Sequence, residues 1–241
     1  MQNLLDIHTH TLASAHAYSS LRENIRQAKE VGLKIFGTSD HSKEMPGVIS
    51  NAFFGNYAAI PRIIDGIIVL CGVEANIKDF HGRIDIDLNH RKVDYAIVSL
   101  HKHCIKPGSI EENTNAIIKS LHHPKIKIVG HPDDDMFPLD YNRLVDSLVE
   151  KGIYAEVNNS SLKETGPRKG AKKNLLKILN IGKEKGLKIV IGSDAHIDLE
   201  VGKIDLAEAI LQEIDYPKEW ILNYESSPEK VLEALEIEMK K

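Results

Sequence analysis

The chain has 241 residues, of which 42% are hydrophobic and 27% are charged, and its formal net charge is −4. These values are typical of an ordinary globular protein, and the negative charge gives no general attraction for nucleic acid. The length suits an α/β barrel folded as one unit, so we expect residues 1–241 to form a single domain.

Short apolar runs alternate with amphipathic stretches along the whole chain, which predicts repeated β-α units. In chain order, we expect strands at Leu4–His10, Lys34–His41, Ile67–Ala75, Tyr95–His101, Ile126–His131, Ile153–Asn158 and Leu187–Asp194. The expected helices are Leu21–Val31, Glu111–His122, Tyr141–Lys151, Lys172–Lys185 and Leu206–Ile214, with a final helix over Ser227–Lys241. Polar residues around Ile84–Asp87 interrupt the pattern, and there we expect a small hairpin or excursion. The order predicts an α/β fold of parallel strands.

Residues able to bind a metal ion stand at the carboxyl ends of these expected strands. They are His8 and His10, His41, Glu74, His101, His131, and finally Asp194 with His196. In a parallel barrel such ends meet on one face, where catalytic groups come from several strands. Alternation along a strand puts His8 and His10 on the same side, so both can face one ion. A single histidine of this kind is most often structural, but the repetition over six of seven strands indicates a metal site.

The number of candidate ligands exceeds the needs of one ion. Imidazoles and carboxylates are the usual ligands of zinc, manganese and iron, and zinc takes about four of them. With His16 the chain offers nine candidates, which suit two or three ions that share a carboxylate. Either Glu74 or Asp194 could be that shared group. We expect His103, two residues beyond His101, to be an ordinary surface residue rather than a proton donor.

Sequence motifs surround these candidates in a fixed order. They are Asp6-Ile7-His8-Thr9-His10, Thr38-Ser39-Asp40-His41, Gly72-Val73-Glu74-Ala75-Asn76, His101, Gly130-His131-Pro132 and Gly192-Ser193-Asp194-Ala195-His196. The set resembles the PHP (polymerase and histidinol phosphatase) superfamily of metal-dependent phosphoesterases. Segments 16–19, 158–161 and 168–170 are most similar to its small single-domain phosphatases with three metal ions. The resemblance implies a distorted, TIM-like (β/α)7 barrel with a trinuclear site, usually of zinc, with manganese or iron as alternatives.

The resemblance also implies which residues hold each ion. The first set is His8, His10, Glu74 and Asp194, the second is Glu74, His101 and His131, and the third is His16, His41 and His196. Glu74 is then the bridge between the first two ions. His101 is followed by Lys102-His103-Cys104, which departs from the family pattern. The resemblance therefore does not assign the substrate contacts at these positions. Asp6 and Asp40 lie beside ligand histidines and are expected to orient an imidazole, although Asp40 could instead be a helix N-cap or a turn residue.

A site of this composition is cationic, because three divalent ions outweigh two ligating carboxylates. A phosphoester is therefore the expected substrate, and we expect a metal-bridging hydroxide to attack phosphorus in line, with Glu74 and Asp194 as catalytic ligands. Arg168 is expected to orient the phosphate through a bidentate fork. Lys102 or Lys169 could assist, although a solvated surface charge is the simpler interpretation for both lysines.

The two cysteines, Cys71 and Cys104, are too few for a disulfide framework. No apolar run approaches the roughly 20 residues needed to span a bilayer. We therefore expect a cytoplasmic protein, with neither a membrane nor nucleic acid as a partner and with a homo-oligomer left open.

Three alternatives to a general phosphatase remain at this stage. A histidinol-phosphatase-type enzyme would use the same site for one metabolite. A PHP exonuclease is less favoured, because no polymerase region or broad basic groove accompanies the barrel. A non-enzymatic PHP module predicts eroded ligands, whereas all nine are present. The sequence thus favours a phosphatase that hydrolyses a small phosphorylated substrate.

Overall fold

A computed structural model describes residues 2–48, 50–89 and 92–239. Within these ranges, seven parallel strands form a nearly closed barrel in the order β1-β2-β4-β5-β6-β7-β8. Their bounds are β1 Leu5–Asp6, β2 Ile35–Thr38, β4 Ile67–Asn76, β5 Tyr95–Ser99, β6 Ile126–Val129, β7 Tyr154–Asn158 and β8 Ile189–Gly192. A short strand, β3 (Ile63–Ile64), pairs antiparallel with β4. The predicted seven-stranded α/β barrel is confirmed.

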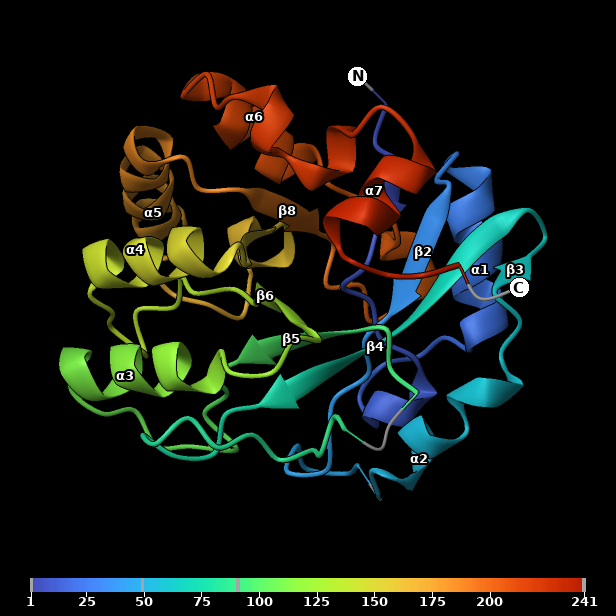
Figure 1. Cartoon of the computed structure of the whole chain (residues 1–241), viewed down its shortest axis with the longest axis horizontal. Coiled ribbons are helices and arrows are strands. Elements are labelled where there is room, and N and C mark those ends of the chain that lie inside the picture. Colours follow the sequence, from blue (N-terminus) through green and yellow to red (C-terminus); the bar gives the residue numbers. More distant parts are fainter. Residues whose placement is uncertain (1, 49, 90–91, 240–241) are drawn as a thin grey trace.

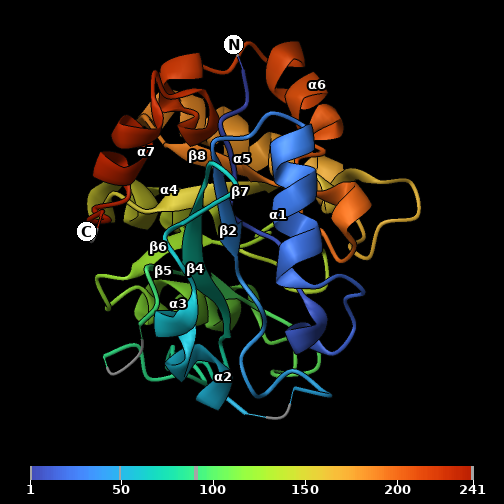
Figure 2. The ribbon, with the colours of Figure 1, turned by 90° about the vertical axis from the view of Figure 1, so that its right-hand side faces the viewer.

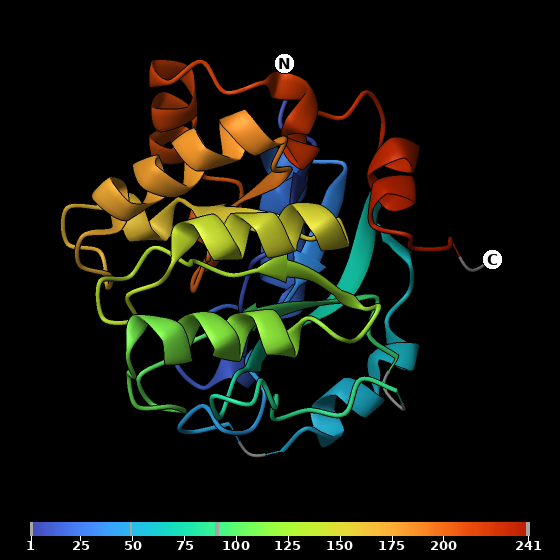
Figure 3. The ribbon, with the colours of Figure 1, turned by 60° about the vertical axis from the view of Figure 1, so that its left-hand side comes forward.

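Helices cover the outside of the strands. They are α1 Leu21–Glu30, α2 Ala52–Gly55, α3 Ile110–Ser120, α4 Tyr141–Lys151, α5 Ala171–Lys185, α6 Asp205–Glu213 and α7 Pro228–Ala234. Single 3-10 turns occur at Leu12–Ser14, Tyr57–Ala59, Ser160–Leu162, Asp198–Glu200, Lys218–Trp220 and Leu222–Tyr224. Figures 1 and 3 show α3, α4 and α5 side by side along one flank of the strands, and Figure 2 shows α1 on another. In the described ranges no helix is long and apolar enough to cross a membrane.

Local signals in the sequence fix where several helices begin and end. Ser20 and Ser109 each cap a helix and exchange hydrogen bonds with a glutamate three residues later, which is a capping box. Gly152 and Gly186 end α4 and α5 in the left-handed conformation. The helix α4 has the expected bounds. The bounds of α1, α3, α5 and α6 differ from the expected ones by at most two residues.

The C-terminal helix is shorter than the sequence predicts. Ser227 caps α7 as expected, but the helix ends at Ala234, and residues 240–241 of the expected range lie outside the described residues. The expected hairpin in the polar excursion amounts to one antiparallel bridge between Ile77 and Ile84. The sequence analysis did not anticipate α2 and β3, because four and two residues are too few to show a hydrophobic period.

The barrel closes between its first and last strands just beyond their carboxyl ends. Thr9 and Ala195 form a parallel bridge there. The backbone N–H of His10 donates to the carbonyl of Ala195 over 2.8 Å, and that of Asp194 donates to the carbonyl of His8 over 2.9 Å. This closure sets residues from opposite ends of the chain side by side, and three of them, His8, His10 and Asp194, are candidate ligands.

The other end of the same seam is joined by a side chain. Asn223, which is fully buried, donates from Nδ2 to the carbonyl oxygens of Leu5 and Ile191 at 3.1 and 3.0 Å. Its Oδ1 accepts the backbone N–H of Ile191 at 2.7 Å. The amide thus satisfies backbone groups of β1 and β8, which do not pair with each other directly in the described sheet.

The interior of the barrel is filled by apolar side chains, with Tyr95 from β5 as the largest of the fully buried ones. The Tyr95 hydroxyl donates to the carbonyl of Ile7 over 2.6 Å. Gly37 and Gly72 make room for this ring, because a Cβ at either position would lie 2.3 Å from an atom of Tyr95. Close packing of this kind supports the residues at the carboxyl end of the barrel.

Candidate metal centre

Glu74, at the end of β4, is buried at the centre of a group of imidazoles. Its Oε1 lies 3.2 Å from Nε2 of His101 and 2.9 Å from Nε2 of His131. Its Oε2 lies 3.4 Å from Nε2 of His8 and 3.5 Å from Nε2 of His10. The two oxygens of one carboxylate therefore face two different groups of imidazoles, which is the arrangement that a bridging ligand requires.

Asp194 completes the group around the first strand. Its Oδ1 lies 3.2 Å from Nε2 of His10 and 3.6 Å from Nε2 of His8. Both of these nitrogens are buried and make no hydrogen bond to a described residue. Buried polar atoms rarely lack a partner, and a cation between them would supply one. The donor set of two imidazoles and two carboxylates fits a divalent transition metal ion.

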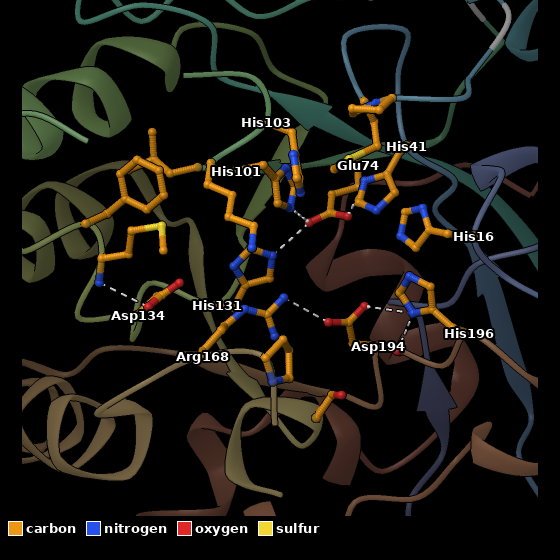
Figure 4. A pocket seen from close by; sticks show the side chains of 18 residues that line it. His16, His41, Glu74, His101, His103, His131, Asp134, Arg168, Asp194 and His196 are labelled. Carbon is orange, nitrogen blue, oxygen red and sulfur yellow. Dashed lines mark hydrogen bonds and ion pairs between the residues drawn. The ribbon is translucent and has the colours of Figure 1, made fainter. Parts of the chain in front are cut away.

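A third group lies beside the first two. The rings of His16 and His196 stack with centroids 4.7 Å apart, and His16 and His41 stack at 5.1 Å. His10 also approaches this group, since its ligand atom lies within 4.8 Å of those of His41 and His196. Figure 4 shows His16, His41 and His196 together on one side of the cavity. The three residues that the resemblance assigns to a third ion therefore lie close together, and His41 also reaches the second group, since its Nδ1 lies 2.9 Å from Glu74 Oε2.

Electrostatics favour ionised carboxylates at Glu74 and Asp194 and neutral imidazoles at His10 and His16. Burial raises the pKa of Glu74, but neighbouring imidazoles hold it well below its usual range. The pKa of Asp194 is likewise low, because a nearby imidazole and the Arg168 guanidinium outweigh burial. Burial and adjacent imidazoles lower the pKa of His10 well below its usual value and that of His16 to about 4. These are the protonation states in which such groups bind metal ions.

Glu156 on β7 is a buried carboxylate of this cluster that no sequence motif indicated. Its Oε1 lies 2.5 Å from Nδ1 of His8, and its Oε2 accepts the backbone N–H of His131 over 2.8 Å. Gly192 leaves space for this carboxylate, because a Cβ there would lie 2.2 Å from Glu156 Oε1. Burial lowers the pKa of His8, but the charge of Glu156 and of two further carboxylates raises it well above the usual value. Glu156 therefore fixes which nitrogen of His8 faces Asp194.

Two other imidazoles are oriented by neutral side chains. Nδ1 of His101 lies 2.7 Å from the Asn76 amide oxygen, and Nδ1 of His10 lies 3.0 Å from the Ser14 hydroxyl. Ser14 in turn donates to Asp40 Oδ1 over 2.7 Å. Asp40 thus reaches an imidazole through Ser14, while it also accepts hydrogen bonds from Thr11, in the loop that follows β1.

Arg168 reaches the cluster from the segment that precedes α5. Its Nη2 donates to Asp194 Oδ2 over 3.0 Å, and its Nη1 donates to Asn158 Oδ1 and Ser161 Oγ at 3.3 and 3.1 Å. Figure 4 shows the guanidinium facing Asp194 across the cavity floor. Burial lowers the pKa of Arg168, but Asp194 and Asp133 raise it, so the side chain stays cationic.

One cavity of about 540 Å³ opens over the cluster. Among the predicted ligands its walls include His16, His41, Glu74, His101, His131, Asp194 and His196, whereas His8 and His10 are buried behind it. Arg168, Lys102 and His103 also line the cavity. Lys169 is exposed and does not line it, which agrees with a solvated surface charge.

Comparisons with known proteins agree with this geometry. The PHP domain family model matches residues 6–186. A probable phosphatase of Clostridium acetobutylicum is 42% identical over 241 residues, which cover 100% of this chain and 97% of the relative. A probable phosphatase of Caldanaerobacter subterraneus is 41% identical over 240 residues, covering 99% and 93%.

A solved structure shares the fold. It is the histidinol phosphate phosphatase of Lactococcus lactis, determined with zinc, L-histidinol and phosphate. The match has a TM-score of 0.60 at 16% identity and covers 89% of this chain and 95% of that one. At this level of identity the likeness is evidence for the barrel and not for a shared substrate.

Proposed function

Because the chain belongs to the PHP domain family, we propose that it is a metal-dependent phosphatase that hydrolyses a phosphomonoester. The observation that carries this proposal is the pair of buried carboxylates, Glu74 and Asp194, whose oxygens face unpartnered imidazole nitrogens beneath one cavity. The relatives named probable phosphatases support the same reaction class.

The proposal includes three divalent ions, of zinc, with manganese or iron as alternatives. Their ligands are His8, His10, Glu74 and Asp194 for the first, Glu74, His101 and His131 for the second, and His16, His41 and His196 for the third. When bound, such ions lower the pKa of a coordinated water and neutralise charge on phosphate oxygens. The short distances around each oxygen of Glu74 support its assignment as the shared ligand.

The chain's own residues then position the substrate. Arg168 has five N–H donors, and the hydrogen bonds found among the described residues use three of them, so others are free for a phosphoryl oxygen. Asp194 faces the imidazoles with Oδ1 and holds Arg168 with Oδ2. A phosphoryl group held by Arg168 is therefore placed directly beside the metal ligands.

We further propose a cytoplasmic protein whose residues 1–241 form one PHP domain. Both cysteines, Cys71 and Cys104, are free thiols, which fits a reducing compartment.

The test combines elemental analysis of the purified protein with phosphate release. Metal-loaded protein is assayed on p-nitrophenyl phosphate and a panel of metabolite phosphomonoesters that includes histidinol phosphate, and chelator-treated protein is the control. We expect release that disappears with chelator and returns with added zinc or manganese. Fewer than two metal equivalents in active protein would contradict the three-ion site. Metal-loaded protein that releases no phosphate from any substrate would instead favour a non-enzymatic module, and single-stranded DNA degradation would favour an exonuclease.

A further inference from the structure

The cavity over the metal ligands is much larger than a phosphoryl group needs. Its volume of about 540 Å³ falls within the range of about 300–1,000 Å³ that is typical of pockets for whole organic ligands. The metal ligands and Arg168 account for one side of it. The remaining space has to hold the part of the substrate that leaves as an alcohol, so the opposite side of the cavity decides which alcohol fits.

That opposite side is mostly apolar. We call it the apolar wall, and it consists of Met45, Pro46, Leu100, Met136 and Phe137. These side chains come from the segments that follow β2, β5 and β6. Figure 4 shows Asp134, to which the backbone of Met136 and Phe137 is hydrogen-bonded, across the cavity from His16 and His196. The part of the wall that follows β6 therefore lies across the cavity from these two imidazoles, whereas Met45 and Pro46 follow His41 in the chain.

The wall is held in place by its own turn and by the core behind it. The backbone N–H of Met136 donates to Asp134 Oδ1, and that of Phe137 donates to the Asp134 carbonyl, both over 3.0 Å. Phe137 is only 4% exposed and packs with Leu100 around a void of about 10 Å³, so little space is left behind it. Met136 is 42% exposed, and a flexible thioether at such a position adapts to differently shaped ligands.

We propose that the apolar wall is a leaving-group subsite, which makes the enzyme selective for monophosphate esters of apolar alcohols over those of sugars and polyols. This inference rests on the proposed phosphatase function. The cavity also has polar lining residues, Lys102, His103, Asp134 and Ser160, of which Asp134 stands beside the wall and holds its turn through Oδ1. The five side chains of the wall themselves offer no hydrogen-bond donor and no strong acceptor. A hydroxylated leaving group placed there would lose hydrogen bonds to water without regaining them.

An alkyl phosphate series tests the subsite. Ethyl, butyl and hexyl phosphate differ little in the basicity of the leaving alkoxide, so differences among them report contact with the wall rather than chemistry. Burial of one methylene strengthens binding about fourfold. We therefore expect KM to fall about fourfold for each methylene until the wall is covered, with kcat nearly constant, and glucose 6-phosphate to be a poorer substrate than hexyl phosphate.

Two methionine variants locate the effect. Met136→Ala shortens an exposed side chain of the wall, and we expect it to raise KM for hexyl phosphate about five- to tenfold while KM for ethyl phosphate changes less than about twofold. Met239→Ala is the matched control, because Met239 is 44% exposed and does not line the cavity. Both variants should retain the wild-type metal content.

The outcomes separate this inference from the proposed function. Phosphate release with no dependence on chain length would overturn the subsite and leave the phosphatase intact. A chain-length dependence that Met136→Ala leaves unchanged would also overturn the assignment to this wall. No release from any ester, ethyl phosphate included, would overturn the proposed function and the inference with it.

Discussion

The two sides of the candidate metal centre are built differently. Around Glu74, the ligands stand on strand ends or directly after them, and His8, His10 and His101 each have a second side chain that fixes the ring. On the other side, His16 is exposed and lies in the loop after a 3-10 turn, and Nδ1 of His196 is hydrogen-bonded to the backbone carbonyl of Asp194 rather than to a second side chain among the described residues. Preorganised ligands bind more tightly, so the group around Glu74 should retain its ions when the third site loses its own.

The largest effect is expected from a substitution of Glu74, at the centre of the well-ordered group. Glu74→Gln keeps the shape of the side chain but removes the charge that both groups of imidazoles face. We expect kcat/KM to fall on the order of 10³-fold and the first two ions to be lost together. Elemental analysis beside kinetics measures both, with circular dichroism as the control for folding. Full metal content in this variant would show that Glu74 is not the shared ligand.

Glu156→Gln leaves all the proposed ligands in place and changes only a residue that orients one of them, His8. The carboxylate that fixes His8 becomes an amide, and we expect the affinity of the first site for zinc to fall about 10- to 100-fold. Competition with a chromophoric chelator measures this affinity. The matched control is Glu150→Gln, an exposed residue on α4 that should leave the affinity unchanged. Equal affinities in the two variants would argue that Glu156 is only structural.

Arg168→Lys separates substrate positioning from metal binding. A lysine keeps the charge but loses the planar fork, so we expect KM for phosphoesters to rise about 10- to 30-fold with unchanged metal content. Lys169→Gln next to it should have no effect, because Lys169 does not line the cavity. Steady-state kinetics on one substrate distinguishes the two. Similar KM values in both variants would remove Arg168 from the substrate site.

The smallest effect is expected from a substitution of His16, which lies in the loop after the 3-10 turn Leu12–Ser14. His16→Asn should release one metal equivalent while two remain, and activity should fall about tenfold. Stepwise removal of metal by a chelator, followed by elemental analysis, checks the count. Loss of all ions at once would mean that the third site is not independent of the other two.

The proposed metal ligands could be named from the sequence because each carries its chemistry in its own side chain, and all of them except His16 stand at or shortly after a strand end. Glu156 could not be named in this way, although a glutamate within the apolar strand Tyr154–Asn158 is a signal that a buried carboxylate needs partners. Its partner His8 is 148 residues away and is brought to it only by barrel closure. The apolar wall was missed for a similar reason, since Met136 and Phe137 face the cavity through a loop turn that no hydrophobic period encodes.

Anomalous diffraction from crystals of the zinc-loaded protein locates the bound ions themselves. We expect three zinc peaks from the proposed three-ion site. Two of them should lie about 3.5–4 Å apart, one on each oxygen of Glu74, and the third should lie among His16, His41 and His196. A single peak, or peaks that do not involve Glu74, would contradict the proposal.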